Sequence, residues 1–531
     1  MLTKVRILSE NMNEAVFEKA NGLAAWVKEH AVIMSCYIAV GTCAFFMLIS
    51  HDLVNNWDGV WYNSRYYAGT WELSIGRWFW LYLDQFRFGI ASSSLNSFVT
   101  LALLAVGNAL LTDLFAVKRK FPAILAGSLF IATPLICDSL TFGFMSVTFG
   151  TAYFLSVLSA FCAVRFQRAF AATLSGGLLL ACSMGCYQAY FGITCLVLLF
   201  YILAMLLKNT DGSILGKTVL RAAGTILTGG ILYRVILSIN LAVHDVDLSG
   251  YRGADTISAV SIVKNLPANM MSAYKSFYLF YFTDSTQKPM FGLREIYILA
   301  FIIAIWILLQ KVMGTLRHSV WKGLLAVLAI LCIPLACCAV LLLVGGENNL
   351  LMAGGLTLLF PLTILLLDDF MERRVLYIVY LVMMSGMLWV NVCIVANDQL
   401  ALWEGRETTL ALARSVVTEL MIDDNIDENT QIAFVGCPSD SACFQKTEAW
   451  EWANGYAQFG TFSTEAGLSS KTWEELLSEY GGMDLNFCSG EIYNIVLEDG
   501  IVEEMTNYPA EGSIQYMRDI NTVVVRISDN Y

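Results

Sequence analysis

The sequence predicts an all-α polytopic membrane protein with about 11 transmembrane helices, followed by a C-terminal α/β domain. Hydrophobic residues make up 57% of the 531 residues and charged residues only 14%, whereas soluble globular proteins carry about 25% charged residues. The mean hydropathy is +0.62. Apolar runs of about 20 residues, the length needed to cross a bilayer, recur along the chain. These observations exclude a soluble enzyme.

The charges divide the chain near residue 396. The first 396 residues carry 26 Lys and Arg against 20 Asp and Glu, whereas residues 397–531 carry 6 against 24. The second segment also lacks an apolar run long enough to span a bilayer. We therefore expect residues 31–396 to form the membrane domain and residues 397–531 to form a separate domain that faces water. The acidity of that domain argues against nucleic acid as a partner.

Residues 1–30 predict a cytoplasmic amphipathic segment instead of a signal peptide, because Glu10, Glu14, Glu18 and Glu29 interrupt them. The first span then covers about residues 31–50. Ten further apolar runs predict spans near residues 95–117, 121–137, 147–164, 169–184, 188–207, 220–241, 293–312, 323–344, 350–367 and 375–396.

Basic residues in the short loops place the N-terminus in the cytoplasm, because cytoplasmic loops carry an excess of Lys and Arg. An odd number of spans then places the acidic domain outside, together with two long outer loops at residues 51–94 and 242–292. The inner clusters are Lys118 to Lys120, Arg165 and Arg168, Lys208 and Lys217, Lys311 with Arg317 and Lys322, and Arg373 with Arg374.

The acidic domain shows mixed periodicity. Helical spacing predicts a helix over residues 408–421, and alternating or β-branched runs predict strands at 431–435, 492–497 and 522–527. Eleven of the 14 cysteines precede Cys437 and fall mostly in apolar runs, where they are typical small packing residues. In an extracytoplasmic domain, a disulfide between Cys437 and Cys443 and two free thiols both remain open.

The first outer loop is rich in aromatic and charged side chains. Twelve of the 32 residues from Trp57 to Phe88 are aromatic, which favours short helices at the membrane surface. Cations are uncommon on the outer side, so those of this loop need an anionic partner, either carboxylates of the same loop or a phosphate from the bilayer. A plain aromatic anchor is the simpler alternative. The charged residues concerned are Asp52, Asp58, Arg65, Arg77 and Arg87.

Three motifs carry a family resemblance. Asp58 is followed by a polar-aromatic stretch and then by Gly-Arg77-Trp, the segment Pro134 to Phe144 includes Asp138, and Cys186-Tyr187-Gln188 follows further on. Together they resemble the Gtr type-II glucosyltransferases, a bacterial group related to the GT-C class of polytopic glycosyltransferases. The resemblance covers about residues 30–400. It implies a GT-C-like fold and an enzyme of the bacterial cell membrane. Such an enzyme takes a sugar, often glucose, from a polyprenyl-phosphate carrier and adds it to a cell-envelope glycan at the outer face.

This chemistry assigns expected roles. Asp58 is the first candidate for the base that activates the acceptor hydroxyl, with Asp52 and Asp138 next, and direct attack would invert the anomeric centre. We expect Asp58 and Arg77 to face each other across a cavity open to lipid and water. The candidates for holding the donor phosphate are Arg77, Arg65 and Arg252, with ion pairs to Glu72, Asp84 or Asp255 as the alternative. Arg234, inside a predicted span, is a further candidate, with a side chain that reaches toward His244 or Asp245 as its alternative. The candidates for sugar or acceptor contacts are Trp57, Trp61, Tyr62, Trp78, Tyr187, Gln188 and Glu347.

No cofactor is expected. The four histidines lack zinc-ligand spacing, and a divalent cation held by Asp58 and Asp138 remains open. Two other functions also remain open. A transporter or flippase of lipid-linked sugars predicts ionisable residues buried inside several spans, of which only Asp113 and Arg234 are candidates. A membrane O-acyltransferase would need a catalytic histidine, for which His51 is the candidate.

Overall fold

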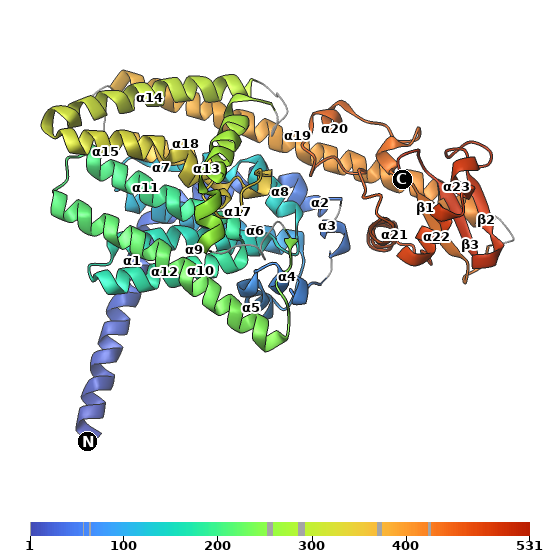
Figure 1. Cartoon of the computed structure of the whole chain (residues 1–531), viewed down its shortest axis with the longest axis horizontal. Helices are drawn as coiled ribbons and strands as arrows, with labels where there is room; N and C mark the ends of the chain where they lie inside the picture. The colour runs from blue at the N-terminus through green and yellow to red at the C-terminus, as the bar shows by residue number, and fades with distance from the viewer. Residues whose placement is uncertain are drawn as a thin grey trace.

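The computed structural model describes residues 2–56, 58–62, 65–251, 259–284, 292–368, 374–422 and 426–531. It is mostly helical and carries a small C-terminal sheet, as the sequence predicts. A helical bundle forms the larger part of the molecule, and the C-terminal domain extends from one end of it (Figure 1). The helices that precede the second half of the bundle are α1 (Leu2–Ala44), α2 (Phe46–His51), α3 (Asp58–Trp61), α4 (Thr70–Ser74), α5 (Trp78–Arg87), α6 (Ser93–Leu114), α7 (Lys120–Ile131), α8 (Pro134–Thr141), α9 (Ser146–Arg165) and α10 (Ala169–Cys186).

The second half of the bundle contains shorter and more interrupted helices. The predicted span at 323–344 is divided near Pro334, and Gly345 and Gly346, both with positive φ, separate it from the predicted span at 350–367. Its elements are η1 (Gln188–Tyr190), α11 (Phe191–Leu207), α12 (Gly212–His244), α13 (Ala259–Phe282), α14 (Leu293–His318), α15 (Val320–Leu331), α16 (Ile333–Cys337), α17 (Leu341–Val344), η3 (Leu350–Met352), α18 (Gly354–Asp368) and α19 (Arg374–Leu420).

Eight helices in the described part of the chain are long and apolar enough to cross a membrane. The number is nine if α7 and α8, which bend by 48° at Pro134, form one span. The predicted spans at 323–344 and 350–367 correspond to the shorter apolar helices α15 and α18 with their short neighbours. The exact total of 11 therefore stays a prediction. Helix α13 occupies the second half of the predicted outer loop 242–292.

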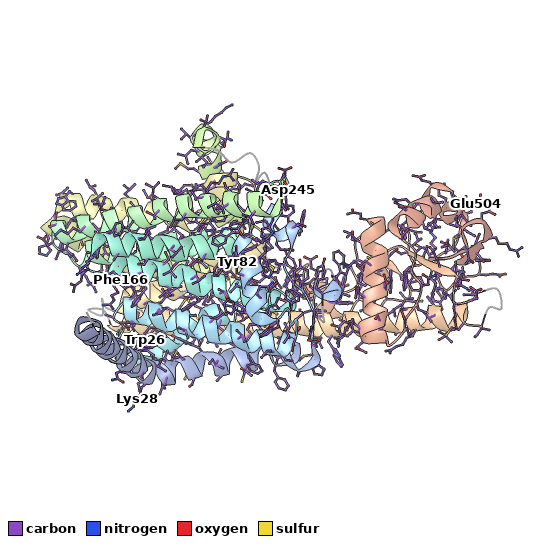
Figure 2. All side chains as sticks on the ribbon, turned by 90° about the horizontal axis from the view of Figure 1, so that it is seen from below. Trp26, Lys28, Tyr82, Phe166, Asp245 and Glu504 are labelled. Carbon is purple, nitrogen blue, oxygen red and sulfur yellow. The ribbon has the colours of Figure 1, made fainter. Side chains whose placement is uncertain are left out.

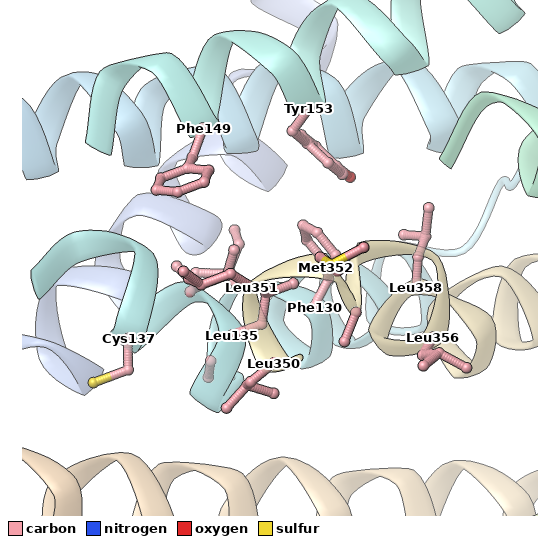
Figure 3. Packing of buried hydrophobic residues seen from close by; sticks show 14 of the residues in the cluster. Phe130, Leu135, Cys137, Phe149, Tyr153, Leu350, Leu351, Met352, Leu356 and Leu358 are labelled. Atoms are coloured by element: carbon pink, nitrogen blue, oxygen red, sulfur yellow. The ribbon is translucent and has the colours of Figure 1, made fainter. Parts of the chain in front are cut away.

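Aromatic and small residues pack the bundle where α7, α8, α9 and α18 meet (Figure 3). Gly127 on α7 illustrates the close approach of helices, because a Cβ there would lie 2.3 Å from the ring of Tyr37. Tyr37 is fully buried and donates a hydrogen bond to the Ala123 carbonyl at 2.7 Å. Small residues at helix contacts are typical of membrane helix packing.

Helix α19 is 47 residues long and runs without a break from the bundle into the C-terminal domain (Figure 1). The predicted boundary at residue 396 lies inside this helix, and the helix predicted over residues 408–421 is its last part. Figure 2 shows Trp26, Lys28 and Phe166 at one end of the bundle and Asp245 at the end that faces the C-terminal domain, with Glu504 in that domain.

The C-terminal domain is built on a three-stranded sheet in the order β1-β3-β2, with β1 parallel and β2 antiparallel to β3. The predicted strands at 431–435 and 522–527 are confirmed. The predicted strand at 492–497 is wrong: these residues lie in α22, which Ser489 caps and which buries Tyr493 and Val496 at helical spacing. The elements are β1 (Gln431–Val435), η5 (Pro438–Asp440), α20 (Glu448–Trp452), α21 (Ala466–Leu476), η6 (Leu477–Gly481), α22 (Gly490–Glu498), α23 (Ile501–Glu504), β2 (Ile514–Met517), η7 (Arg518–Ile520) and β3 (Thr522–Arg526).

All 14 cysteines are free in the structure, so the disulfide left open from the sequence is not formed. Cys437 is buried and its thiol donates a hydrogen bond to the Gly460 carbonyl at 3.2 Å. Cys443, by contrast, is exposed.

Candidate active site

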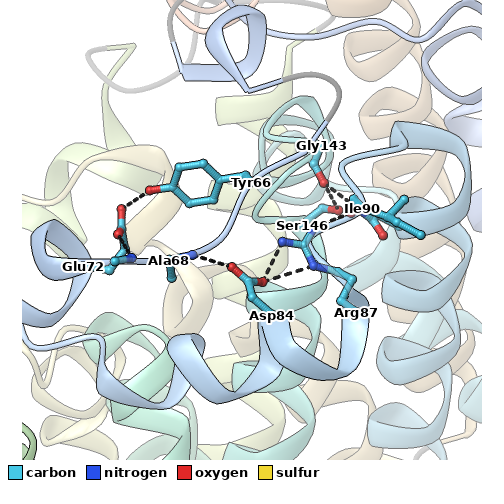
Figure 4. A network of polar contacts seen from close by, with 10 residues as sticks. Tyr66, Ala68, Glu72, Asp84, Arg87, Ile90, Gly143 and Ser146 are labelled. Atoms are coloured by element: carbon cyan, nitrogen blue, oxygen red, sulfur yellow. Dashed lines mark hydrogen bonds and ion pairs between the residues drawn. The ribbon is translucent and has the colours of Figure 1, made fainter.

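The first outer loop forms three short helices, α3, α4 and α5, on a network of buried polar contacts (Figure 4). Asp84 is fully buried and accepts hydrogen bonds from the Ala68 N–H at 2.8 Å and from Arg87 at 2.6 Å. Arg87 also donates to the Ile90 carbonyl at 2.6 Å. Burial raises the pKa of Asp84, and the charge of Arg87 opposes that shift. This network holds the start and the end of the loop together.

Glu72 fixes the middle of the loop. Its carboxylate accepts hydrogen bonds from the Tyr66 hydroxyl and from the Gly69 N–H, the second at 2.7 Å. Burial raises the pKa of Tyr66, and the hydrogen bond to Glu72 raises it further. The ring of Tyr66 packs on Tyr62 and Phe144, with ring centres 4.4 and 4.9 Å away. The aromatic residues of the loop therefore join the segment after α8.

Asp58 begins helix α3 and is half-buried. The Gly59 N–H donates to the Asn55 side chain at 3.2 Å, and that side chain in turn donates to the Thr141 carbonyl at the end of α8, also at 3.2 Å. Burial raises the pKa of the Asp58 carboxyl; the positive charges of Arg77 and Lys471 lower it and the charge of Glu72 raises it. The Asp58 carboxylate therefore lies close enough to Arg77, Lys471 and Glu72 for their charges to change its pKa.

Arg77 stands at the N-cap of α5, and its place depends on the residue before it. Gly76 has a φ of +86°, and a Cβ there would lie 2.4 Å from the Tyr233 hydroxyl and 2.8 Å from Nε2 of Gln188. Tyr233 donates to the Gly76 carbonyl at 3.1 Å, and Gln188 donates to the Ile75 carbonyl at 2.7 Å. Only glycine fits this turn, which tight hydrogen bonds from α12 and η1 hold in place.

The guanidinium of Arg77 lies against an aromatic wall. Its central carbon is 5.1 Å from the ring centre of Tyr187 and 6.0 Å from that of Trp80, and Nη1 donates to the sulfur of Met145 at 3.7 Å. The Nε atom is buried without a hydrogen-bond partner. No carboxylate in the described part of the chain lies within ion-pair distance of Arg77. The alternative ion pairs to Glu72 and Asp84 are therefore not formed, and Asp255 lies outside the described residues.

The C-terminal domain supplies the third charged group. Lys471 on α21 places its Nζ atom 5.0 Å from the ring centre of Trp61 and 4.6 Å from that of Tyr62. The indole N–H of Trp61 donates to the hydroxyl of Thr472 at 2.8 Å. The sequence did not predict Lys471, which lies more than 400 positions beyond Asp58. The one feature of the sequence that could have drawn attention to Lys471 is its positive charge, because residues 397–531 contain 6 basic and 24 acidic residues.

The structure brings Asp58, Arg77, Trp61, Tyr62, Tyr187 and Gln188 to one region, whereas other predicted site residues lie elsewhere. Asp138 is 1% exposed and accepts a hydrogen bond from Asn454 at 3.1 Å. The same amide donates to Asp398 at 2.9 Å. Asp138 is not among the charged groups that act on Asp58. The main-chain carbonyl of Asp52 accepts a hydrogen bond from Arg406 at 3.3 Å.

Four other residues predicted for the site form no hydrogen bond, ion pair or ring contact with Asp58 or Arg77 among the described residues. Trp78 is 4% exposed, packs against Gly185 and Phe79 and belongs to a separate apolar cluster with Leu73 and Leu237. Glu347 is exposed, and an ion pair with Lys275 at 2.6 Å lowers its pKa. Arg65 and Arg234 have exposed side chains. Two predicted residues, Trp57 and Arg252, lie outside the described residues.

Two further expectations concern the shape and the ligands of the site. A cavity of about 330 Å³ is lined by Lys118, Arg119 and Asp368 and lies away from Asp58. The predicted cavity between Asp58 and Arg77 therefore stays a prediction. Within the described ranges, no three His, Cys, Asp or Glu side chains gather as metal ligands. A divalent cation held by Asp58 and Asp138 also stays a prediction.

Comparison with known proteins supports the resemblance noted in the sequence. A family model described as glucosyl transferase GtrII matches residues 62–390 of the 531. The match includes Arg77, Asp138 and Tyr187, begins four residues after Asp58 and ends before the C-terminal domain. No curated protein and no solved structure matches the chain. The chain belongs to the GtrII glucosyl transferase family, and with its long apolar helices it is a multi-pass membrane glycosyltransferase.

Proposed function

We propose that this glycosyltransferase moves a hexose, with glucose as the first candidate, from a polyprenyl-phosphate carrier to a cell-envelope glycan at the outer face of the bacterial membrane. The observation that supports this proposal is that the charge of Arg77 acts on the carboxyl of Asp58. A half-buried carboxylate lies within electrostatic reach of a guanidinium whose Nε has no partner. A base and an anion-binding cation are the two groups that transfer from a lipid phosphosugar requires.

The proposed step uses both groups at once. The acceptor hydroxyl attacks C1 of the sugar and gives its proton to the Asp58 carboxylate. The bond between C1 and the phosphate oxygen breaks, its electron pair stays on that oxygen, and the guanidinium of Arg77 stabilises the new negative charge. A single displacement inverts the configuration at C1. Because its pKa is raised, Asp58 is a stronger base than an ordinary aspartate.

Neither rival function is favoured by an observation. A transporter predicts ionisable groups buried at mid-membrane, but Asp113 lies one residue from the end of α6 and forms an ion pair with Arg165 at 3.0 Å. Arg234 is exposed on the surface of α12. For acyl transfer, His51 would be the catalytic base. It is exposed, and its Nδ1 lies 2.8 Å from the hydroxyl of Ser50.

The test is the structure of the envelope glycan in a deletion strain that carries the wild-type gene or the Asp58→Asn variant. We expect the deletion to remove a hexose, the wild type to restore it, and Asp58→Asn to lower the transfer rate by roughly 10²- to 10⁴-fold. The exposed Asp247, in the segment after α12, offers a matched control, because Asp247→Asn removes one carboxylate without touching the described site.

Protein amount separates this result from misfolding. Burial disfavours the charged form of Asp58, so its ionised carboxylate lowers stability at neutral pH and Asn removes that charge. We therefore expect Asp58→Asn to reach the membrane in wild-type amounts and to melt at the same or a higher temperature at pH 7. An unchanged glycan in the deletion strain, or full transfer by Asp58→Asn, would contradict the proposal.

A further inference from the structure

The C-terminal domain packs directly on the helix that carries Asp58. Helix α21 lies against α3, and two adjacent residues of α21 interact with aromatic side chains there. Thr472 accepts the hydrogen bond from Trp61, and Lys471 lies over the rings of Trp61 and Tyr62. The aromatic pair is therefore shared between the membrane domain and the C-terminal domain.

Further contacts fix this domain in place. The buried side chain of Asn56 donates to the Gln458 carbonyl at 2.9 Å and accepts from the Gly460 N–H at 2.6 Å. Asn454 donates to Asp138 on α8, as described above. Asn56 lies two residues before α3, and Asp138 lies on α8. The C-terminal domain is therefore held to the membrane domain at two places besides the contact made by Lys471 and Thr472.

Lys471 also differs from the other lysine of the domain. Lys446 lies 5.1 Å from the ring centre of Trp450 and forms an ion pair with Asp440 at 3.4 Å. Lys471 is half-buried over a comparable aromatic surface, but no carboxylate among the described residues lies within ion-pair distance of its Nζ atom. The charge of Lys471 acts on Glu475, four residues further along α21, and on Asp58 of the site. Because no ion pair in the described part of the chain holds the lysine, its ammonium group can also contact another anion.

We propose that Lys471 is a second cation of the active site and that the C-terminal domain, by presenting it beside Arg77 and Asp58, takes part in binding the donor phosphate. This inference rests on the proposed function and extends it beyond residues 62–390, the part that the family model matches. The chemistry explains the need for two cations. A glycosyl phosphodiester carries one negative charge, whereas the phosphomonoester that leaves carries about −1.5 to −2 charges at pH 7. A second cation matches the charge that develops as the bond to C1 breaks.

Binding of farnesyl phosphate tests the inference without turnover. The full-length protein is placed in nanodiscs of phosphatidylcholine, and its affinity for farnesyl phosphate is measured by calorimetry, with farnesol as the uncharged comparison. We expect Lys471→Met to weaken binding of the phosphate by roughly 10- to 100-fold and to leave farnesol binding unchanged. Lys471→Arg should restore most of the affinity, and the matched control Lys446→Met should bind like the wild type.

A second measurement separates a role in the site from a purely structural one. The charges of Arg77 and Lys471 both lower the pKa of Asp58, so Lys471→Met removes one of these two cations. The acidic limb of the pH dependence of transfer should therefore move to higher pH in Lys471→Met and stay in place in Lys446→Met. A lysine whose charge does not reach Asp58 would leave this limb in place.

The outcomes are distinct. If Arg77→Met loses affinity for farnesyl phosphate while Lys471→Met binds like the wild type, the role of Lys471 is refuted and the proposed function stands. If Lys446→Met loses affinity as much as Lys471→Met, the effect is one of general charge and the inference also fails. If the wild type does not bind farnesyl phosphate, or Arg77→Met binds it equally well, the phosphate site itself is wrong.

Discussion

Two arginines at opposite ends of α5 show what the first outer loop does with its cations. The guanidinium of Arg87 forms an ion pair with Asp84 and donates a hydrogen bond to the Ile90 carbonyl. Among the described residues, Arg77 contacts aromatic rings and a thioether and forms no ion pair, and its Nε is buried without a hydrogen-bond partner. An unsatisfied buried donor costs about 1–3 kcal/mol. The comparison teaches that one cation supports the fold, whereas the other has no carboxylate within ion-pair distance among the described residues and, under the proposed function, serves the donor phosphate.

The largest expected effect separates the two arginines by stability. Arg87→Met leaves the Asp84 carboxylate buried without its counter-ion, which should lower the free energy of unfolding by about 3–5 kcal/mol at neutral pH. Because the pKa of Asp84 is already raised by burial, the variant should regain stability as the pH falls and the carboxyl becomes protonated. Thermal unfolding of the purified variant between pH 5 and pH 8, a range in which carboxyl groups with raised pKa values titrate, measures both effects. A melting temperature equal to that of the wild type would remove the distinction between Arg87 and Arg77.

The complementary variant should lose function and keep stability. Arg77→Met removes no ion pair among the described residues, so its melting temperature should stay close to that of the wild type. Transfer and affinity for farnesyl phosphate should each fall by roughly 10- to 100-fold, the range expected for a hydrogen bond to a charged group. A loss of stability as large as that of Arg87→Met would mean that Arg77 also serves the fold.

A smaller effect is expected at the residue that positions Arg77. Gly76→Ala forces a side chain into a left-handed conformation and into contact with Tyr233 and Gln188. We expect a loss of stability of about 1–2 kcal/mol together with weaker binding of farnesyl phosphate. Gly230→Ala on α12 is a matched control, because a Cβ there would meet nothing within 4 Å. If Gly76→Ala and Gly230→Ala have the same stability and the same affinity for farnesyl phosphate, the turn before Arg77 accepts a side chain without harm to the site.

The smallest effect concerns pH. Since burial raises the pKa of Asp58, transfer should be lost, as the pH falls, at a higher pH than an ordinary aspartate would give. Glu72→Gln removes the acid that raises this pKa and should move the limb to lower pH by less than about one unit. The dependence of kcat/KM on pH measures both shifts. An acidic limb that does not move between wild type and Glu72→Gln would argue against Asp58 as the base.

The sequence predicted the loop that carries the charges but could not place all of its side chains. Asp58, Arg77, Tyr187 and Gln188 could be named because they belong to short motifs that resemble a known family. The direction of Trp78 depends on how α5 lies on α10, which no local pattern records. Lys471 could not be predicted, because its contact with the loop joins residues more than 400 positions apart and arises only when the domain docks.

The limits of the fold prediction have similar causes. Apolar length predicts a span, but the run at 121–137 bends near Pro134 and the run at 323–344 breaks near Pro334, so the number of crossings does not follow from hydropathy alone. In the C-terminal domain, the β-branched run at residues 492–497 favours a strand, yet the cap at Ser489 and burial at helical spacing make it a helix. Local propensity yielded to tertiary packing in that segment.

The uninterrupted course of α19 has a consequence for the lipid around the enzyme. At 47 residues the helix is about 70 Å long, which exceeds the thickness of a bilayer with its headgroups. The height at which this rod leaves the hydrocarbon therefore sets how far the acidic domain stands above the surface. Hydrophobic mismatch tilts helices of this kind, so membrane thickness becomes a physical variable that tunes the fit of the domain on the first outer loop.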